Sequence, residues 1–204
     1  MDKHEIIAFF DGAAQEWDSH LIVDEKKIAC VLDAAGELRG RTVLDAACGT
    51  GVLFPYYLQR GAARVIGVDI SSEMTRIAAE KGWDSSVEIL CGDMETMQAV
   101  RPCDCGVVYN AFPHFLEPEK LAAALWRWIK PDGRLVVAHS MSLEELQRHH
   151  AVRAKQVSRT MLTTQEMNDL LSPWFAVDTM ISDEEKYIVA GTRRESLGSR
   201  CTDL

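Results

Sequence analysis

The sequence has few cysteines, no long apolar run and a shortage of positive charge. Its cysteines do not fall into paired spacings, so neither a disulfide framework nor a zinc site is indicated, and we expect reduced thiols. No apolar run approaches the roughly 18 to 20 residues of a membrane span, and the first residues mix acids with apolar side chains, unlike a signal peptide. These absences predict a cytoplasmic protein that is neither embedded in a membrane nor held together by disulfides.

The negative net charge of the chain argues against some classes of binding partner. The chain has 22 Lys and Arg against 31 Asp and Glu, a formal charge of −9, which repels phosphate backbones and anionic lipid surfaces. We therefore expect no nucleic acid and no membrane as partner. With 204 residues and 47% apolar side chains, the chain suits a single domain, as a monomer or homodimer. We divide it into a helical segment (1–35) that covers the substrate, a core (40–192) and a tail (193–204).

Apolar, β-branched runs alternate with helix-like stretches through the core. The runs are residues 42–47, 64–68, 87–90, 105–109 and 134–138, and the helical stretches are 52–59, 72–81 and 118–129. Such alternation predicts right-handed crossovers and a parallel sheet covered on both faces. Residues 6–10 and 22–32 look like amphipathic helices outside this core.

The end of the chain follows a different pattern. A helix is predicted at 163–171, opened by a Thr163 cap with Glu166 three residues on. Residues 175–181 and 186–192 read as strands too close together for anything but an antiparallel hairpin. The predicted fold class is α/β: a Rossmann-like, doubly wound, mostly parallel seven-stranded sheet with a reversed terminal strand and an N-terminal helical lid.

Acids and glycines follow the first three predicted strands. The first strand runs into Asp45-Ala-Ala-Cys-Gly49-Thr-Gly51, where glycines let backbone approach a ligand closely. The second strand ends at Asp69 and the third at Asp93. Ligands of open parallel sheets bind at this edge, where one acid can accept ribose hydroxyls and the other an adenine amino group. The pattern predicts a nucleoside site.

A dinucleotide-binding protein is the competing interpretation. Its fingerprint needs a third glycine three residues past the second, for close packing of helix on strand, and this chain has Phe54 there. The negative charge of Asp45 would repel a pyrophosphate, whereas it would attract a cationic sulfonium or ammonium group. The loop favours a cationic nucleoside.

These motifs resemble those of class I S-adenosylmethionine-dependent methyltransferases, over roughly residues 9–192. The matching segments are FFDGAAQEWD, VLDAACGTG, VIGVDIS, CGDMETM, VVYNAFPHF and LWRWIKPDGRLVVAHS, the first of them similar to the opening of small-molecule members. The resemblance implies that S-adenosylmethionine is the cofactor, with Asp45 and Gly49 to Gly51 at the aminocarboxylate and Asp69 at the ribose. It implies Ile70 and Met94 at the adenine faces and Asp93 at its amino group. Ala47, Asn110 and Trp17 complete the implied cofactor-binding set.

Histidines gather after the fourth and fifth predicted strands. His114 follows the fourth, His139 closes the fifth, and His149 and His150 come ten and eleven residues later. The surrounding N-A-F-P-H-F and H-S-x-S-x-E-E patterns resemble a subgroup of bacterial methyltransferases, with departures at Leu143 and Gln147. We predict that His114, His139 and His150 line one acceptor cavity as catalytic residues, one of them as general base, and that together they can bind a divalent metal.

The predicted function is methyl transfer from S-adenosylmethionine to a small-molecule acceptor through an O, N, S or C nucleophile. Two alternatives stay open. One is a metal-binding protein that uses this scaffold without methyl transfer, and the other is a dinucleotide oxidoreductase. The acceptor itself is not indicated by any motif.

Overall fold

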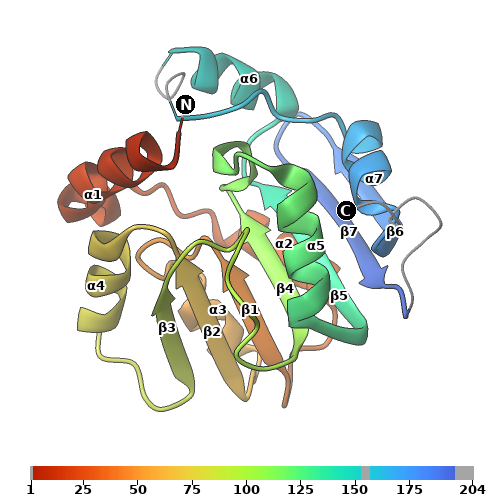
Figure 1. Cartoon of the computed structure of the whole chain (residues 1–204), viewed down its shortest axis with the longest axis horizontal. Coiled ribbons are helices and arrows are strands. Elements are labelled where there is room, and N and C mark those ends of the chain that lie inside the picture. The colour runs from red at the N-terminus through yellow and green to blue at the C-terminus, as the bar shows by residue number, and fades with distance from the viewer. Residues whose placement is uncertain (1, 153–156, 196–204) are drawn as a thin grey trace.

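The computed structural model describes residues 2–152 and 157–195, with the helix backbone alone for residues 149–152. Figure 1 shows the arrangement of its elements. In chain order they are α1 (Lys3–His20), α2 (Glu25–Ala35), β1 (Thr42–Ala46), α3 (Phe54–Gln59), β2 (Arg64–Asp69), α4 (Ser72–Glu80), β3 (Val87–Cys91), β4 (Cys103–Tyr109), the 3₁₀ turn η1 (Phe112–His114), α5 (Pro118–Trp128), β5 (Ile129–His139), α6 (Leu143–Val152), α7 (Thr164–Leu171), β6 (Phe175–Ser182) and β7 (Tyr187–Arg193).

In the described part of the chain seven strands form one sheet in the order β3-β2-β1-β4-β5-β7-β6. The pairs among β1 to β5 are parallel, and β7 runs antiparallel to both β5 and β6. The predicted fold class is confirmed, including the hairpin, whose short Asp183 turn leaves no room for a crossover. The reversed strand lies one place inside the sheet edge (Figure 1).

Strand side chains alternate between two cores. Leu44 and Ala46 point to the face covered by α5 and α7, whereas Val43 points to the face covered by α2 and α3. Figure 1 shows α5 and α7 in front of the sheet with α2 and α3 behind it. Both faces are buried, as the near-continuous apolar strands predict.

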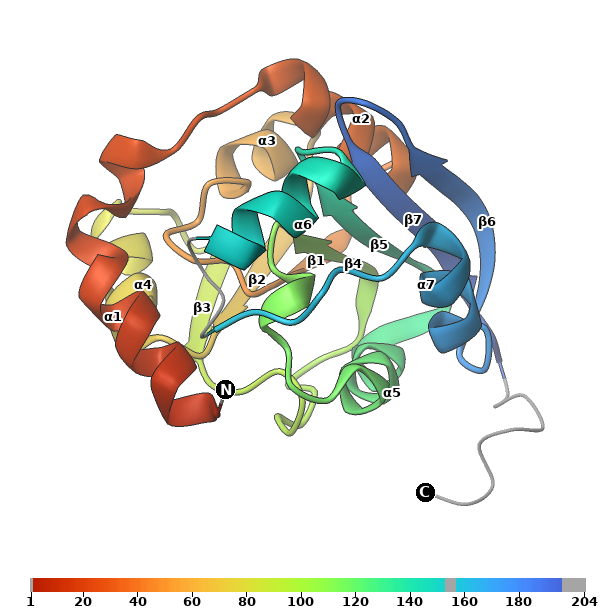
Figure 2. The same ribbon diagram turned by 90° about the horizontal axis from the view of Figure 1, so that it is seen from above.

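Two helices lie across the carboxyl edge of the parallel strands. Figure 2 looks down on this edge and shows α1 and α6 over it, with α1 alongside α4. α1 begins with a capping box between Asp2 and Glu5 and buries Ile6 and Ala14. These helices cover the carboxyl edge of the sheet, where ligands of such sheets bind.

The expected bounds of several helices were wrong. α1 spans Lys3–His20 rather than 6–10, α2 spans Glu25–Ala35 rather than 22–32, and residues 143–152 form α6. α2 starts later because Asp24 caps it, its carboxylate accepting from the N–H groups of Lys26 and Lys27. No helix within the described residues has the length and apolar character needed to span a bilayer.

Candidate active site at the carboxyl edge of the sheet

A cavity lies at the carboxyl edge of the parallel strands. Its wall is built from α1, the linker to α2, and the loops that follow β1, β2, β3 and β4. It holds about 1170 Å³ free of protein atoms, open solvent at its mouth included. Strand order reverses between β1 and β4, and crevices beside such a point bind ligands in open α/β sheets. This cavity is the candidate active site.

The loop after β1 forms one wall. It turns through three residues with positive φ, Ala47 (64°), Gly49 (53°) and Gly51 (82°), a conformation that favours glycine. The N–H of Ala47 donates to the carbonyl of Val68 at 2.8 Å, which fixes the loop on β2. Ala47 and Gly49 line the cavity, whereas Gly51 lies behind it, where a Cβ would stand 2.7 Å from the Phe54 ring.

Asp69, at the end of β2, ties two cavity loops together. One carboxylate oxygen accepts from the N–H of Gly49 at 2.8 Å and the other from the N–H of Ser71 at 2.9 Å. Burial raises the pKa of Asp69, and these two donors oppose the rise. Each carboxylate oxygen has a second lone pair, so the group can accept further hydrogen bonds from a ligand in the cavity.

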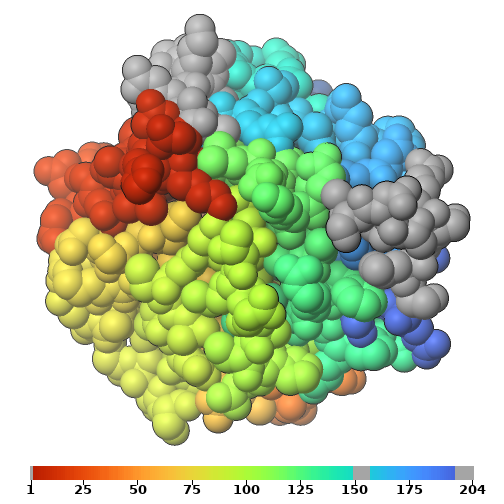
Figure 3. All heavy atoms as spheres, viewed as in Figure 1, coloured from red at the N-terminus to blue at the C-terminus, as the bar shows by residue number. Residues whose placement is uncertain are grey.

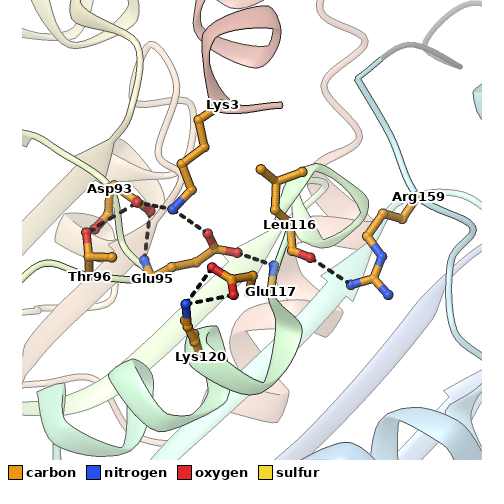
Figure 4. Close-up of polar contacts among 8 residues, drawn as sticks. All are labelled: Lys3, Asp93, Glu95, Thr96, Leu116, Glu117, Lys120 and Arg159. Atoms are coloured by element: carbon orange, nitrogen blue, oxygen red, sulfur yellow. Dashed lines mark hydrogen bonds and ion pairs between the residues drawn. The ribbon is translucent and has the colours of Figure 1, made fainter. Parts of the chain in front are cut away.

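Asp93, after β3, is held by three groups. Oδ1 accepts from the N–H of Glu95 at 3.0 Å, and Oδ2 accepts from the Thr96 hydroxyl at 3.2 Å and forms an ion pair with Lys3 of α1 (Figure 4). Asp93 lines the cavity as predicted. The lysine from α1 is an unexpected partner.

Glu95 extends this network to the start of α5. Its side chain is buried and pairs with Lys3 at 2.9 Å through Oε2, while Oε1 accepts from the N–H of Glu117 at 2.6 Å. On the other side of the same loop Arg159 donates to the carbonyl of Leu116 at 3.2 Å (Figure 4). The loops after β3 and β4 are therefore joined by polar contacts beside the cavity.

Apolar side chains form the walls between these acids. Ile70 and Met94, predicted at the adenine faces, both line the cavity. Ile70 packs in a small apolar cluster with Ile6 and Phe10 of α1. A flat aromatic ligand that binds between such side chains would bury apolar surface, which is favourable.

Asp45 lies beneath the loop, outside the cavity lining. On β1 it shares a face with Val43, toward Tyr57 of α3. Burial raises the pKa of Asp45 to about 8, and the nearby Asp69 raises it further. Its Oδ2 has no hydrogen-bond partner among the described residues. Asp45 thus lies outside the cavity lining, and its predicted contact with the aminocarboxylate stays a prediction.

His114, in η1, lines the cavity as predicted. Its Nδ1 lies 2.8 Å from the carbonyl oxygen of Val157 and 3.1 Å from the hydroxyl of Ser158. A carbonyl can only accept, so Nδ1 donates a proton in this contact. The ring stands edge-on to Phe10 with centroids 5.0 Å apart.

Of the other two predicted histidines, His139 does not line the cavity. His139 is 1% exposed, stands edge-on to Tyr187 at 6.3 Å, and is not part of the cavity lining. It shares the face of Val137, which packs under α5 and α7. His150 lies on α6, and its side chain is outside the described residues. Among the described side chains, no His, Cys, Asp and Glu group can hold a metal ion.

Asn110 and Trp17 both line the cavity. Asn110 adopts φ 54°, and its side-chain oxygen accepts from the N–H of Ser140 at 2.8 Å, which joins the ends of β4 and β5. The indole Nε1 of Trp17 lies 4.0 Å from where a Cβ on Gly49 would stand. Trp17 therefore closes the cavity over the glycine loop.

Sequence reasoning missed two groups of cavity residues. One is a set of charged side chains on α1 that contact the cavity loops: Lys3, Asp11 and Asp18. The other lies on the linker after α1, on α2 and at the end of β4: Leu21, Ile22, Val23, Ile28 and Tyr109. The spacing of Asp11 and Asp18, two helical turns apart, was a signal for the first group. The second carries no motif.

Comparison with known proteins agrees with this geometry. Residues 44–137 match the family model described as a methyltransferase domain. The chain is 33% identical over 143 residues to a ubiquinone biosynthesis O-methyltransferase of Neisseria meningitidis serogroup C, covering 65% of this chain and 60% of that protein. It is 28% identical over 178 residues to a malonyl-[acyl-carrier protein] O-methyltransferase of Pseudescherichia vulneris, covering 85% of this chain and 70% of that protein. The chain thus spans about 60% of the length of its ubiquinone-biosynthesis relatives.

A solved structure has the same fold. The magnesium protoporphyrin IX methyltransferase of Synechocystis PCC 6803, determined with bound SAH, superposes with a TM-score of 0.71 at 21% identity. The superposition covers 95% of this chain and 100% of the other.

Proposed function

Because residues 44–137 match the family model described as a methyltransferase domain, we propose that the chain is a class I S-adenosylmethionine-dependent methyltransferase that transfers a methyl group to a hydroxyl oxygen of an apolar small molecule. The observation that carries the proposal is the Asp69 carboxylate, fixed between the loops after β1 and β2 with lone pairs left for ribose hydroxyls. The scattered cysteines, unpaired in the described part, suit a reducing cytosol.

The residues of the cavity fit the cofactor. Asp69 would accept the ribose hydroxyls, Ile70 and Met94 would hold the adenine faces, and Asp93 would accept from the adenine amino group. Gly49 has no side chain to obstruct the methionine end, which Trp17 would cover. When bound, S-adenosylmethionine supplies a methyl carbon activated by its sulfonium charge. The protein then has to align the acceptor and exclude water.

The acceptor half of the cavity lies toward β4 and β5. Lys27 of α2 donates to the carbonyl of Ser140 at 2.9 Å, which places the start of α2 and the preceding linker over that end of the sheet. The linker and α2 contribute Leu21, Ile22, Val23 and Ile28 to the lining. An apolar wall suits an acceptor whose body is uncharged and hydrophobic.

His114 is the proposed general base. A hydroxyl must lose a proton when it accepts a methyl group, and we assign the His114 imidazole, which lines the cavity, to take it. Hydrogen bonding of Nδ1 to the Val157 carbonyl fixes the orientation of the ring. The names of two relatives, both O-methyltransferases, support an oxygen nucleophile. His139 lies outside the cavity lining, so the predicted three-histidine metal site has no place in this proposal.

Calorimetry on the purified chain tests the cofactor. We expect S-adenosylhomocysteine to bind with one site per chain and NAD not to bind, since Phe54 fills the space a dinucleotide loop reserves for glycine. Tight NAD binding without S-adenosylhomocysteine binding would refute the proposal. Transfer of labelled methyl groups to a panel of phenols, thiols and amines then identifies the acceptor atom.

A further inference from the structure

One face of α1 carries both the cavity wall and three charged side chains. At 100° per residue, Lys3 lies beside Phe10 in the helical projection, while Asp11 and Asp18 lie together at the edge of the same face. In the space-filling view the atoms of α1 lie directly against those of α4 (Figure 3). The helix therefore has a row of charges facing the loops around the cavity.

Each charge contacts a different cavity loop. Asp18 accepts from the hydroxyl of Thr50, in the glycine loop, at 2.5 Å. Asp11 accepts from the hydroxyl of Ser71, two residues beyond Asp69, at 2.5 Å. The third contact, at the other end of the helix, joins Lys3 to the loop after β3.

That third contact is the ion-pair cluster of Figure 4. Lys3 bridges Asp93 and Glu95, at 2.9 Å from the latter. A secondary ion pair reinforces the opposite end, where Asp18 lies 2.7 Å from Lys81. Thus α1 is fastened once to each of the three loops that we propose to hold the cofactor.

The ion pairs at the two ends of α1 are partly exposed to solvent. Lys3 and Asp93 are 30% and 20% exposed and Asp18 is 45% exposed, so the Lys3–Asp93 and Asp18–Lys81 pairs each contribute little, whereas Glu95, the second partner of Lys3, is only 2% exposed. α1 itself buries only Ile6 and Ala14, and it is followed by an irregular linker in which Ile22 is 92% exposed. The helix can therefore leave without disrupting the core.

We propose that Lys3, Asp11 and Asp18 act together as a clasp that retains the cofactor and sets the rate at which it is exchanged for product. The inference rests on the proposed function. Because Ile6, Phe10 and Trp17 of α1 line the cavity, a cofactor bound there would be covered by this helix, and its exchange would require the clasp to open. Closing it shields the sulfonium from water and completes the methionine end of the site. These three are positioning residues, since they act through the loops and the helix.

Stopped-flow tryptophan fluorescence tests the clasp, because Trp17 lines the cavity. Mixing protein with increasing S-adenosylhomocysteine gives the association rate as the slope and the dissociation rate as the intercept. We expect Lys3→Met, Asp11→Asn and Asp18→Asn each to raise the dissociation rate about three- to five-fold, with an unchanged or faster association rate. Glu16→Gln is the matched control and should match the wild type, because Glu16 is an exposed carboxylate on the same helix whose side chain contacts no cavity loop within the described residues.

Salt provides a second readout that needs no variant. The Lys3 and Asp18 ion pairs are screened as ionic strength rises, so dissociation from the wild type should accelerate between about 0.05 and about 0.5 M NaCl. Lys3→Met should flatten that dependence. Unchanged dissociation rates in all three variants, slower association alone, or salt-independent release from the wild type would each overturn the clasp. Failure of S-adenosylhomocysteine to bind the wild type at all would instead refute the proposed function.

Discussion

The carboxylate of Asp69 and the backbone N–H of Gly49, twenty residues apart in the chain, are joined by a hydrogen bond of 2.8 Å. The bond makes the shape of the glycine loop depend on the acid after the next strand. It also orients the carboxylate toward the cavity, since its other oxygen is fixed by Ser71. One residue thus builds the site and, in our proposal, binds the ribose.

Asp69→Ala should weaken S-adenosylhomocysteine binding by about 1.5–3 kcal/mol, or roughly 10- to 150-fold in Kd. The variant loses the charge-assisted bonds to the ligand and leaves the Gly49 N–H without its acceptor. Calorimetry gives the affinity, and circular dichroism checks the fold. Asp69→Asn keeps one side-chain oxygen acceptor, so its affinity for S-adenosylhomocysteine should lie between those of the wild type and Asp69→Ala. An unchanged Kd in a folded Asp69→Ala protein would remove this residue from the site.

Asp45 should make stability depend on pH. Burial raises its pKa to about 8 in the folded chain, from an ordinary value of 3.8. Between these two values the folded state holds a proton that the unfolded state has lost, so the free energy of unfolding falls as pH rises through this window. In Asp45→Asn this contribution is absent.

Urea unfolding of both proteins across the window from about pH 5 to about pH 8 measures the effect. The stability of the wild type minus that of Asp45→Asn should decrease steadily as pH rises. Other titrating groups are common to both proteins and largely cancel in the difference. A difference independent of pH would show that Asp45 is ionised in the folded protein throughout.

Much of the fold is readable from local patterns. The strand before the glycine loop was expected at 42–47 and spans Thr42–Ala46, because an apolar run ending in Asp and Gly has few alternatives. The length of α1 was underestimated because its apolar periodicity is interrupted by Asp11, Gly12, Glu16 and Asp18. Two of those acids bind loops distant in sequence, and such partners are invisible to a single-sequence reading.

The candidate site was predicted unevenly for a similar reason. Strand ends locate residues at one edge of the sheet, but alternation decides which way each side chain points. His139 shares the face of Val137 and is buried under the helices, whereas His114 lies in a turn beyond its strand and reaches the cavity. The third histidine, His150, lies outside the described side chains, so its part in the site stays a prediction.

Two glycines should respond oppositely to alanine. A Cβ on Gly67 in β2 would stand 2.5 Å from the Phe54 ring and 2.9 Å from the sulfur of Cys48, so Gly67→Ala should destabilise the protein by about 1–3 kcal/mol. A Cβ on Gly12 in α1 would meet nothing within 4 Å, so Gly12→Ala should stabilise it by up to about 1 kcal/mol. Urea unfolding measures both. If both substitutions changed the free energy of unfolding equally and in the same direction, the tight packing around Gly67 would be contradicted.

His114→Gln should reduce methyl transfer about 10²- to 10⁴-fold, the usual contribution of a general base. The Kd for S-adenosylhomocysteine should change little, because the proposed cofactor contacts are on other loops. Transfer is measured with the acceptor found in the panel of nucleophiles, and calorimetry gives the affinity. Parallel losses of turnover and cofactor affinity would assign His114 to cofactor binding instead of proton transfer.

The linker after α1 should determine how well apolar acceptors bind. Ile22 and Val23 are 92% and 47% exposed, yet both line the cavity, so an apolar molecule entering there would cover side chains that otherwise face water. In the presence of S-adenosylhomocysteine, we expect the neutral probe 2-naphthol to bind and its anionic analogue 6-hydroxynaphthalene-2-sulfonate to bind much less.

The double variant Ile22→Ser, Val23→Ser should weaken 2-naphthol binding about three- to ten-fold, since each side chain loses apolar contact area with the probe. Affinity for S-adenosylhomocysteine should be unaffected. Val100→Ser is the matched control, because Val100 is a 51% exposed valine outside the cavity lining. Probe fluorescence titration measures the affinity of both probes for the wild type, the double variant and the control. Equal affinities for the neutral and sulfonated probes, or no loss in the double variant, would mean that the acceptor contacts another wall of the cavity, and the polar rim around Asn110 would become the next candidate.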